Sequence, residues 1–239
     1  MITIENTEVF GWEAAIRGMR NALNSWDNSD SFFWVDGSGL EKAWGINDSV
    51  KSGEFRVSIG EKDNNLMQRL SKAGSDHGKF LRMINVTCDI VAPLYWWKEA
   101  STYRVGVTMN SCSTMHKIHA KEFTLDDFSH EHLLTSWEDE DLVDYNYGEY
   151  LNTARDVLDW TIYALNTYRS RYLETKDKKY WWQLIQLLPS SYNQRRTVQM
   201  NYQVLKNMYF ARKNHKLDEW REFCTWCETL PYFKEVCVE

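Results

Sequence analysis

The chain has 239 residues, which is enough to bury a substantial core within one domain. Its 43% hydrophobic and 26% charged residues exclude a disordered protein, and only three prolines favour a helix-rich fold. The net charge of −6, without a long basic block, argues against a dedicated nucleic-acid-binding protein, but it leaves room for a basic pocket that holds one small anion.

The first half of the chain predicts short strands that alternate with helices. We expect an edge strand over residues 1–9 and an amphipathic helix over 11–23. Residues 32–62 are rich in turns and carry two short β-like pieces, FFWV and EFRVSIG. Further along, we expect a helix over 64–72 that stops at Gly74, a central strand within 80–91 that ends before Pro93, and a helix over 94–99.

Residues 105–118 (VGVTMNSCSTMHKI) interrupt this pattern, because they show neither the alternation of a strand nor the stripe of a helix. Hydroxyl, thiol and amide groups crowd together there in an otherwise aromatic and apolar chain. His116 with His119, and His130 with His132, are spaced like metal ligands on a strand. No carboxylate partner accompanies them, so we expect no metal site.

Helices dominate the second half. Thr124-Leu-Asp-Asp resembles the capping box of a short helix. A long helix over 148–173 has its apolar stripe at Leu151, Ala154, Val157, Leu158, Ile162 and Leu165. Three shorter helices are expected over 181–188, 198–212 and 217–230. Because no internal repeat or low-complexity linker divides the sequence, we predict one α+β domain over residues 1–239.

The five cysteines are an odd number, and no apolar N-terminal segment or membrane-length run accompanies them. We therefore expect a reduced, cytoplasmic protein that does not enter a membrane. Cys224 and Cys227 have the spacing of a redox motif, but they fall in a helical pattern, so we interpret them as ordinary helix cysteines. Cys112 has no adjacent base that would make it a nucleophile, and we interpret it as a buried structural thiol.

A helix over 201–215 would place polar groups beside an apolar face formed by Leu205 and Met208. The polar groups on that face are Asn201, Arg212 and His215, with Asn207 toward its edge. A guanidinium on a buried face needs a partner. It either forms an internal salt bridge, or it lines an amide-rich pocket where it meets a phosphate or an electron-rich ring.

The same residues carry a family resemblance. The leucine–proline pair at 188–189 is followed by Asn201, Asn207, Arg212, His215 and a helix containing Trp220. This pattern resembles the C-terminal third of the flavin-dependent thymidylate synthases, including the interval from the proline to the first asparagine. Relative to the family's pattern, His215 comes one residue early. The resemblance implies that Asn201, Asn207, Arg212 and His215 hold FAD, with His77 as the candidate for the family's flavin-binding histidine.

The stretch from Thr108 to His116 aligns with the family's signature of serine, any residue, asparagine, glutamate, any residue, serine, glycine, arginine, tyrosine. Asn110 and Ser113 match, whereas Ser111, Thr114 and Met115 replace the glutamate, glycine and arginine. Of the arginine–histidine–arginine that opens the signature only Arg104 remains, and it is displaced. The resemblance is clearest over residues 60–230.

The resemblance implies a small antiparallel sheet with long helices, in a homotetramer whose flavin sites are shared between subunits. It also implies a pyrimidine deoxynucleotide substrate, with FAD as cofactor and NADPH and a methylene-folate as further reactants. The expected substrate-binding residues are Asn110, Ser111, Ser113, Thr114 and Arg195, and the catalytic candidates are Ser113 and Arg104. Because the charged signature is altered, we expect a changed substrate or one-carbon donor.

Two other functions stay open. A catalytically inactive relative that binds or sequesters a nucleotide would also lose the signature's charged residues while keeping its amides. Alternatively, the aromatic residues, 15% of the chain, could build a subunit interface in a protein without a ligand. A flavin absorption band in the purified protein would favour the enzyme.

Overall fold

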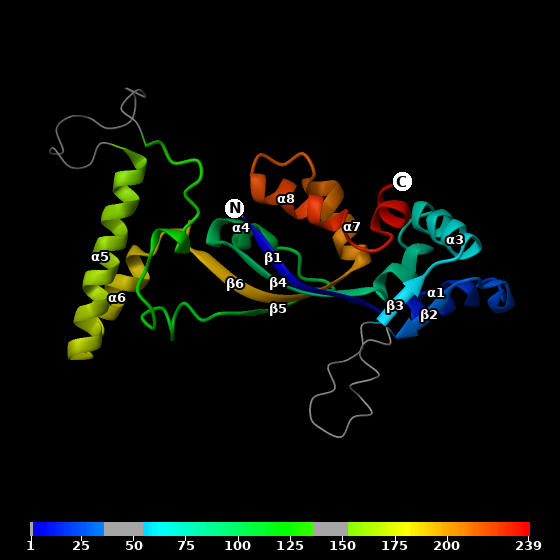
Figure 1. The fold of residues 1–239 in the computed structure, drawn as a ribbon, viewed down its shortest axis with the longest axis horizontal. Coiled ribbons are helices and arrows are strands. Elements are labelled where there is room, and N and C mark those ends of the chain that lie inside the picture. Colours follow the sequence, from blue (N-terminus) through cyan, green and yellow to red (C-terminus); the bar gives the residue numbers. More distant parts are fainter. Residues whose placement is uncertain (1, 36–54, 136–152) are drawn as a thin grey trace, which may run out of the picture. The chain divides into compact units, whose positions relative to one another are not determined.

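The computed structural model of the protein describes residues 2–35, 55–135 and 153–239 (Figure 1). These residues form two compact units. The first unit contains residues 2–3, 89–102, 109–135 and 153–197, and the second contains 4–35, 55–88, 103–108 and 198–239. Whether the chain folds as the single domain expected from its sequence stays a prediction.

The fold is α+β, with a small antiparallel sheet and several helices, as the sequence predicts. Four strands follow the order β1-β4-β6-β5 in this sheet. Their bounds are Thr3–Phe10 for β1, Asn85–Pro93 for β4, Thr108–Ser111 for β5 and Asn193–Asn201 for β6. The edge position of β1 and the inner position of β4 are confirmed.

Two sequence predictions near these strands are wrong in part. Phe80 and Leu81 are buried, but they lie in a short 3-10 helix, Gly78–Arg82, so β4 begins only at Asn85. Residues 198–201 belong to β6 and not to a helix, because Val198 and Met200 alternate with exposed neighbours and point into the core. Over so few residues, periodicity alone does not distinguish a buried strand from a helix.

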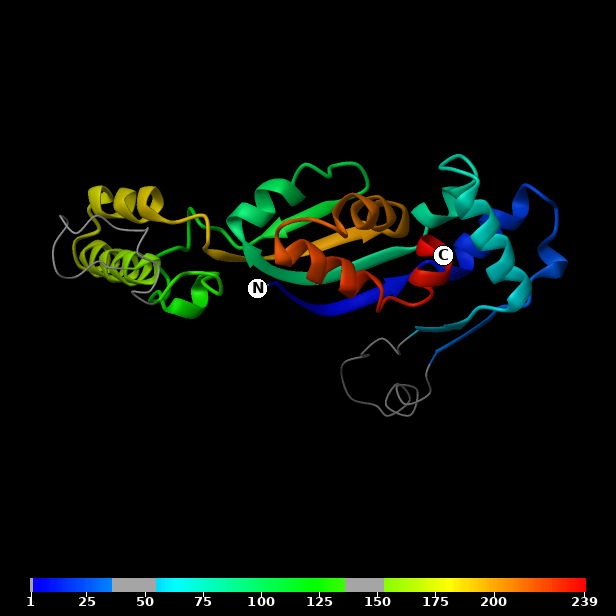
Figure 2. The same ribbon diagram turned by 90° about the horizontal axis from the view of Figure 1, so that it is seen from above.

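In the first unit, a pair of helices packs together: α5 (Ala154–Thr175) and α6 (Lys178–Leu187) lie side by side in both views (Figures 1 and 2). Their apolar faces join a buried cluster of Ile118, Phe123, Phe128, Leu158, Leu165 and Leu184. Val157 was expected on the same stripe, but it is 49% exposed, because it lies one position before Leu158 and so faces about 100° away. The helix α4 (Leu94–Ala100) follows β4 directly.

Polar caps fix the helix starts in this unit. Thr153 caps α5, because its side chain accepts from the backbone N–H of Asp156, whose carboxylate accepts from Thr153 in return. Thr124 and Asp127 form the same kind of box at a short 3-10 helix, Leu125–Asp127, which confirms the capping pattern read from the sequence. The expected start of α5 at residue 148 lies outside the described residues.

The second unit contains the remaining helices and a hairpin. The helices are α1 (Trp12–Asn21), α3 (Glu61–Lys72), α7 (Tyr202–Arg212) and α8 (Asp218–Cys227). The FFWV and FRVS pieces form the antiparallel strands β2 (Phe32–Val35) and β3 (Phe55–Ser58), as expected. A short π-helical segment, Lys234–Val238, ends the chain.

Close packing around Trp12 explains the junction between β1 and α1. Trp12 is 1% exposed, and its ring packs edge-on against Tyr202 and Tyr232. Gly11 precedes it with φ +95°, and a Cβ there would lie 2.1 Å from the carbonyl oxygen of Met83. Only glycine therefore permits this turn.

A buried ion pair joins α1 to α3. Arg20 donates from Nε to Asp63 at 2.6 Å, and the hydroxyls of Ser29 and Ser31 donate to the other carboxylate oxygen at 2.7 Å. Burial raises the pKa of Asp63, but the hydrogen bonds from Ser29, Ser31 and Arg20 outweigh it and lower that pKa below its ordinary value. The carboxylate is thus ionised and fully satisfied inside the unit.

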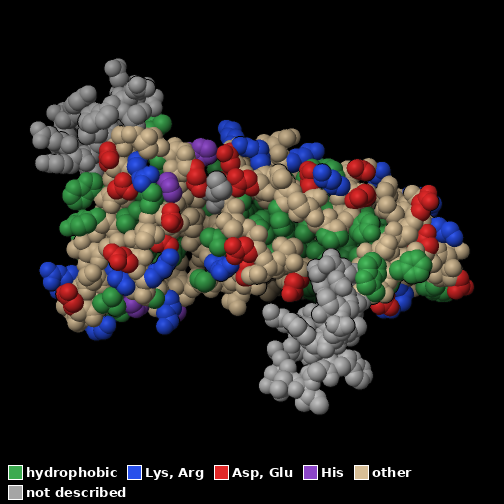
Figure 3. All heavy atoms as spheres, viewed as in Figure 1, with side chains coloured by type: hydrophobic (Ala, Val, Ile, Leu, Met, Phe, Trp, Pro, Cys, Tyr) green, Lys and Arg blue, Asp and Glu red, His purple; other side chains and the backbone are tan. Residues whose placement is uncertain are grey.

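Charge is dispersed on the surface. Acidic and basic side chains are interspersed on the face shown in Figure 3, in keeping with the absence of a long basic block from the sequence. Among the described residues, no helix combines the length and the apolar composition that crossing a membrane would require.

Candidate functional site

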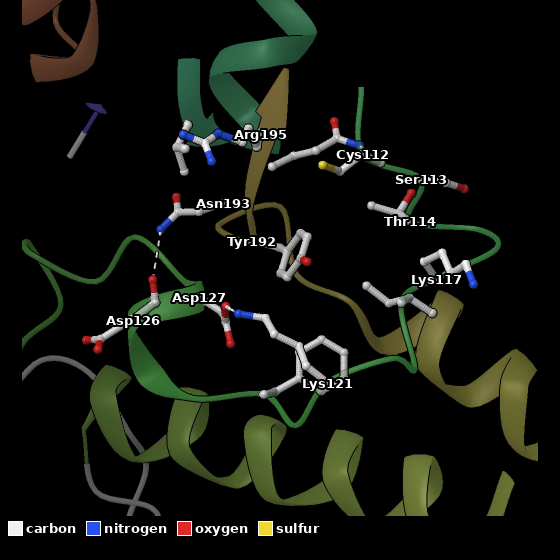
Figure 4. A pocket seen from close by; sticks show the side chains of 14 residues that line it. Cys112, Ser113, Thr114, Lys117, Lys121, Asp126, Asp127, Tyr192, Asn193 and Arg195 are labelled. Carbon is white, nitrogen blue, oxygen red and sulfur yellow. Dashed lines mark hydrogen bonds and ion pairs between the residues drawn. The ribbon is translucent and has the colours of Figure 1, made fainter. Parts of the chain in front are cut away.

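The unusual stretch from the sequence borders a pocket of about 540 Å³ in the first unit (Figure 4). Its walls come from two main segments, the loop after β5 and the beginning of β6. The lining residues are Cys112, Ser113, Thr114, Lys117, Ile118, Lys121, Phe123, Asp126 and Asp127 from the loop, Tyr192, Asn193, Gln194 and Arg195 around the start of β6, and Val91 of β4.

Hydrogen bonds to β6 hold the start of this loop. Cys112 donates its backbone N–H to the carbonyl of Arg195 at 3.0 Å, and the amide of Gln194 donates to the carbonyl of Cys112 at 2.7 Å. The backbone N–H of His116 then donates to the Ser113 hydroxyl oxygen at 2.9 Å, which tightens the next turn. The β5 strand therefore ends in a fixed loop that presents small polar side chains.

Opposite charges meet in the pocket. Lys121 forms an ion pair with Asp127, and the two side chains meet near the centre of Figure 4. The Nη2 atom of Arg195 lies 3.9 Å from Oδ2 of Asp89. Lys117 is exposed, and no hydrogen bond or ion pair joins its side chain to another described residue. The pocket thus offers at least one ammonium group for an anion.

Tyr192 supplies an aromatic wall. Burial, and then the nearby charge of Asp127, raises the pKa of its hydroxyl above the ordinary value for tyrosine. The phenol is therefore neutral at neutral pH and able to donate a hydrogen bond. With Phe123, it gives the pocket the flat apolar surface that a heterocyclic base would need.

Three of the substrate-binding residues expected from the sequence line this pocket: Ser113, Thr114 and Arg195. Asn110 and Ser111 precede it on β5, where both are exposed, and they are not among its lining residues. Arg104 is an exposed residue of the second unit.

Sequence reasoning missed the lining residues Lys117, Lys121, Tyr192 and Asn193. Lys117 lies inside the stretch that attracted notice, but its charge had no counterpart in the family's signature. The other three come together only when the loop folds against β6.

Arg196 on the opposite face of β6 positions this loop. Its guanidinium lies 4.3 Å from the centre of the Trp97 ring and donates to the Gln194 side-chain oxygen at 3.0 Å and to the Ser101 hydroxyl at 3.1 Å. Burial lowers the pKa of Arg196 below its ordinary value. Since Gln194 in turn holds the carbonyl of Cys112, Arg196 stabilises the loop through Gln194.

In the second unit, Arg212 lies against two rings. Its guanidinium is 4.7 Å from the Trp220 ring centre and 5.7 Å from that of Tyr103, and its Nε donates to the Tyr103 hydroxyl at 3.0 Å. Trp220 is fully buried. The electron-rich rings that Arg212 contacts are thus supplied by the protein itself.

The two asparagines expected to hold a flavin have different local roles. Asn201 caps α7, since its side-chain oxygen accepts from the N–H of Val204 at 3.1 Å. A Cβ on Gly106 would lie only 2.8 Å from the side-chain nitrogen of Asn201. Gly106, whose φ is +74°, therefore leaves room for the Asn201 amide. Asn207 is exposed, and its oxygen accepts from the Gln203 amide at 3.0 Å.

The two histidines complete the expected set. His215 is half-buried, packs edge-on against Trp220, and accepts at Nδ1 from the N–H of Leu217 at 3.2 Å. His77 is exposed, and the 3-10 helix that follows it packs against α7. All five expected residues therefore belong to the second unit, on or near α7.

The pair Cys224 and Cys227 is buried on α8, and burial raises the pKa of both thiols, for Cys224 to about 11. Thiols with raised pKa values are poor nucleophiles, which agrees with their interpretation as ordinary helix cysteines. The expected burial of Cys112 is wrong, because Cys112 is exposed where the loop after β5 lines the pocket. No cluster of His, Cys, Asp or Glu that could hold a metal ion occurs within the described ranges.

No protein-family model matches the chain, and no curated protein matches it in sequence. Solved structures do match. Thymidylate synthase X from Helicobacter pylori, determined with FAD and dUMP, matches with a TM-score of 0.63 and 17% sequence identity over 100% of this chain and 98% of that chain. A second structure of the enzyme from this organism, described as a flavin-dependent thymidylate synthase complexed with FAD and dUMP, matches with a TM-score of 0.62 and 16% identity over 98% and 97% of the two chains.

The UMP/dUMP methylase PolB from Streptomyces cacaoi, bound with 5-Br dUMP, matches with a TM-score of 0.55 and 14% identity. The match covers 96% of this chain and 89% of that chain. The chain therefore has the fold of the flavin-dependent thymidylate synthases, as the resemblance in its sequence implied.

Proposed function

We propose that the protein is a flavin-dependent enzyme that modifies a pyrimidine deoxynucleotide and receives it in the pocket of the first unit. One observation carries the proposal: Ser113, Thr114 and Arg195, chosen from the sequence as substrate-binding residues, line a single pocket of about 540 Å³. The fold supports it, because proteins that share this fold were crystallised with FAD and dUMP.

The pocket's chemistry suits such a ligand. Tyr192 and Phe123 provide apolar surface for a base, and the Ser113 and Thr114 hydroxyls are suited to a sugar or phosphate. Lys117 and Arg195 supply positive charge for a phosphate, in place of the arginine that the signature has lost at Met115. Asn110 and Ser111 on the preceding strand are kept in the proposed substrate set, with Ser113 and Arg104 as the proposed catalytic residues.

For the cofactor, we propose that Asn201, Asn207, Arg212, His215 and His77 hold FAD. Asn207 and His77 have exposed side chains, whereas Asn201 and Arg212 would bind while also stabilising α7 and α8. When bound, the flavin would supply the redox chemistry, and NADPH and a methylene-folate are the proposed electron and carbon donors.

We also propose a homotetramer with sites shared between subunits, in the cytoplasm. Exposed aromatic side chains on α5 support the oligomer: Trp160 is 50% exposed and Tyr163 is 65% exposed, and their rings pack edge-on. Aromatic residues are enriched at subunit interfaces. Size-exclusion chromatography with multi-angle light scattering tests this directly, and a monomer at micromolar concentration would contradict it.

A second candidate is a catalytically inactive protein that binds a nucleotide. The altered signature favours it, since Ser111, Thr114 and Met115 stand where the family has charged or small residues. Both candidates predict nucleotide binding, but only the enzyme predicts flavin.

The test begins with the absorption spectrum of the purified protein. A flavin band that bleaches with NADPH and recovers on addition of a nucleotide would support the enzyme, whereas a protein that neither retains FAD nor is stabilised by it would overturn that function. Arg212→Ala should lose the flavin but keep the far-UV circular dichroism of the wild type. Arg17→Ala, at an exposed arginine of the same unit, is the matched control and should keep its flavin.

A further inference from the structure

Three cations gather around His119, beside the pocket of the first unit. Arg169 of α5 donates from Nε to the carbonyl of His119 at 3.0 Å. The Tyr172 ring packs edge-on against the His119 ring with centroids 4.9 Å apart, and the ammonium of Lys176 lies 6.0 Å from the Tyr172 centroid. Lys117 lines the pocket itself, and its charge also acts on His119. We call Lys117, Arg169 and Lys176 the basic rim.

The basic rim has no acidic partner within the part of the chain that the structure describes. Three other cations on α5 and α6 do have one: the pairs are Arg155 with Asp159, Arg171 with Glu174, and Lys179 with Asp177. The sequence holds 34 acidic and 28 basic residues, so carboxylates are not scarce. Three like charges together repel one another, and a bound anion would relieve this repulsion.

The charges of the basic rim affect the pKa of His119. Its Nδ1 atom is buried and has no hydrogen-bond partner among the described residues. Burial first, and then the charges of Lys176, Lys117 and Arg169, lowers the pKa of the imidazole. The ring is therefore neutral at neutral pH, and an anion on the rim would raise its pKa again.

Helix capping accounts for only part of this arrangement. Lys176 ends α5 in the left-handed conformation, with φ +56°, and a cation there stabilises the helix dipole. Arg169 lies before the last turn of the helix, and Lys117 comes from a separate loop. Their convergence on His119 is not explained by the end of the helix.

We propose that the basic rim binds the outer phosphates of a pyrimidine nucleoside diphosphate or triphosphate whose base and sugar occupy the pocket. The proposal rests on the proposed function for the base and sugar, and it adds the phosphate chain. Lys117 serves the phosphate nearest the pocket, and Arg169 and Lys176 serve those beyond it. The protein therefore prefers a nucleotide with more than one phosphate.

Calorimetric titration with dUMP, dUDP, dUTP and inorganic tripolyphosphate tests the preference, with the His119 pKa followed in parallel by NMR. The wild type should bind dUTP at least about tenfold more tightly than dUMP, because each charged contact to a phosphate contributes strongly. Lys176→Gln and Arg169→Gln should reduce this ratio toward one and leave the dUMP affinity unchanged. Arg171→Gln, at an exposed and paired arginine of the same helix, should keep the wild-type ratio.

Every other outcome of these titrations either supports or overturns the proposed phosphate site. Equal affinity of the wild type for dUMP and dUTP would overturn the proposal, as would an equal loss in Arg171→Gln and Lys176→Gln. If no deoxyuridine nucleotide binds, the proposed function fails, and the basic rim is then judged by tripolyphosphate alone. Tripolyphosphate that raises the His119 pKa in the wild type but not in Lys176→Gln would support an anion site, and no change in the wild type would overturn it.

Discussion

The polar residues of the two units are used differently. In the second unit, Asn201 caps α7 and Arg212 lies against Tyr103 and Trp220, so residues that match the flavin-dependent synthases already take part in the packing of the protein. In the first unit, the side chains of Lys117 and Thr114 line a pocket without a hydrogen bond to another described residue. Residues with structural duties are hard to exchange, whereas residues that only face a ligand can change when the ligand does. On the proposed function, this contrast would account for amides and Arg212 that match the family beside a signature that differs.

The largest expected effect concerns the packing of Trp220 in the second unit. Trp220 is fully buried, carries the Arg212 guanidinium on its ring, and packs edge-on against Phe223. Trp220→Ala should lower the free energy of unfolding by about 3–5 kcal/mol, because it leaves a large cavity. Urea denaturation measures the change. Trp26→Ala, at a half-exposed tryptophan of the same unit, should cost less than about 1 kcal/mol in the same assay, and equal losses would contradict the distinction.

The next prediction concerns Lys117, whose side chain lines the pocket of the first unit. Lys117→Gln should weaken nucleotide binding about tenfold, or about 1.4 kcal/mol, because an ammonium–phosphate contact is lost. Its unfolding free energy should stay within about 0.5 kcal/mol of the wild type, since the side chain has no described partner. Calorimetry and urea denaturation check the two halves.

The control for this change is Lys179→Gln, which removes an exposed cation that is paired with Asp177. It should alter neither the affinity nor, beyond a few tenths of a kcal/mol, the stability. A loss of affinity equal to that of Lys117→Gln would show that only the overall charge matters.

Much of the fold was accessible from the sequence, because local patterns determine it. Three patterns each act over a few residues: the aromatic and β-branched FFWV piece, the Thr124 capping box, and the apolar stripe at Leu158 and Leu165. The strand at 198–201 was missed, since four residues, even with Val198 and Met200 alternating with polar neighbours, also fit the start of a helix and only pairing within the sheet decides.

The candidate site was less accessible, because it depends on residues far apart in the chain. The register of the signature pointed to Ser113 and Thr114, which line the pocket. Nothing local indicates that Arg196 lies on Trp97, or that Arg169 reaches the carbonyl of His119 fifty residues away. The binding of a flavin or nucleotide by any of these residues stays a prediction.

A smaller effect tests whether Asn201 is kept for the helix. Asn201→Ala should cost about 1 kcal/mol of unfolding free energy through the lost cap of α7, whether or not flavin is present. Asn201→Asp keeps the acceptor and should retain most of the stability. If the alanine variant is as stable as the wild type in the absence of flavin, the capping role does not explain why the asparagine is there.

The smallest effect has a pH signature. The Tyr209 hydroxyl donates to Glu228 at 2.6 Å, and this hydrogen bond, with burial, raises the pKa of Tyr209 from 10.0 to about 12. The folded protein therefore keeps the phenol protonated at a pH where the unfolded chain ionises it, so the contribution is complete below pH 10 and is lost as the pH rises toward 12. Tyr209→Phe should cost about 0.5–1 kcal/mol at pH 8, and urea denaturation should show the gap to the wild type closing above pH 10. Tyr163→Phe, at an exposed tyrosine, is the control. If the difference in unfolding free energy between Tyr209→Phe and the wild type stays constant from pH 8 to about pH 11, Glu228 does not hold the Tyr209 proton. The polar groups of the second unit would then contribute less to its stability than their geometry indicates.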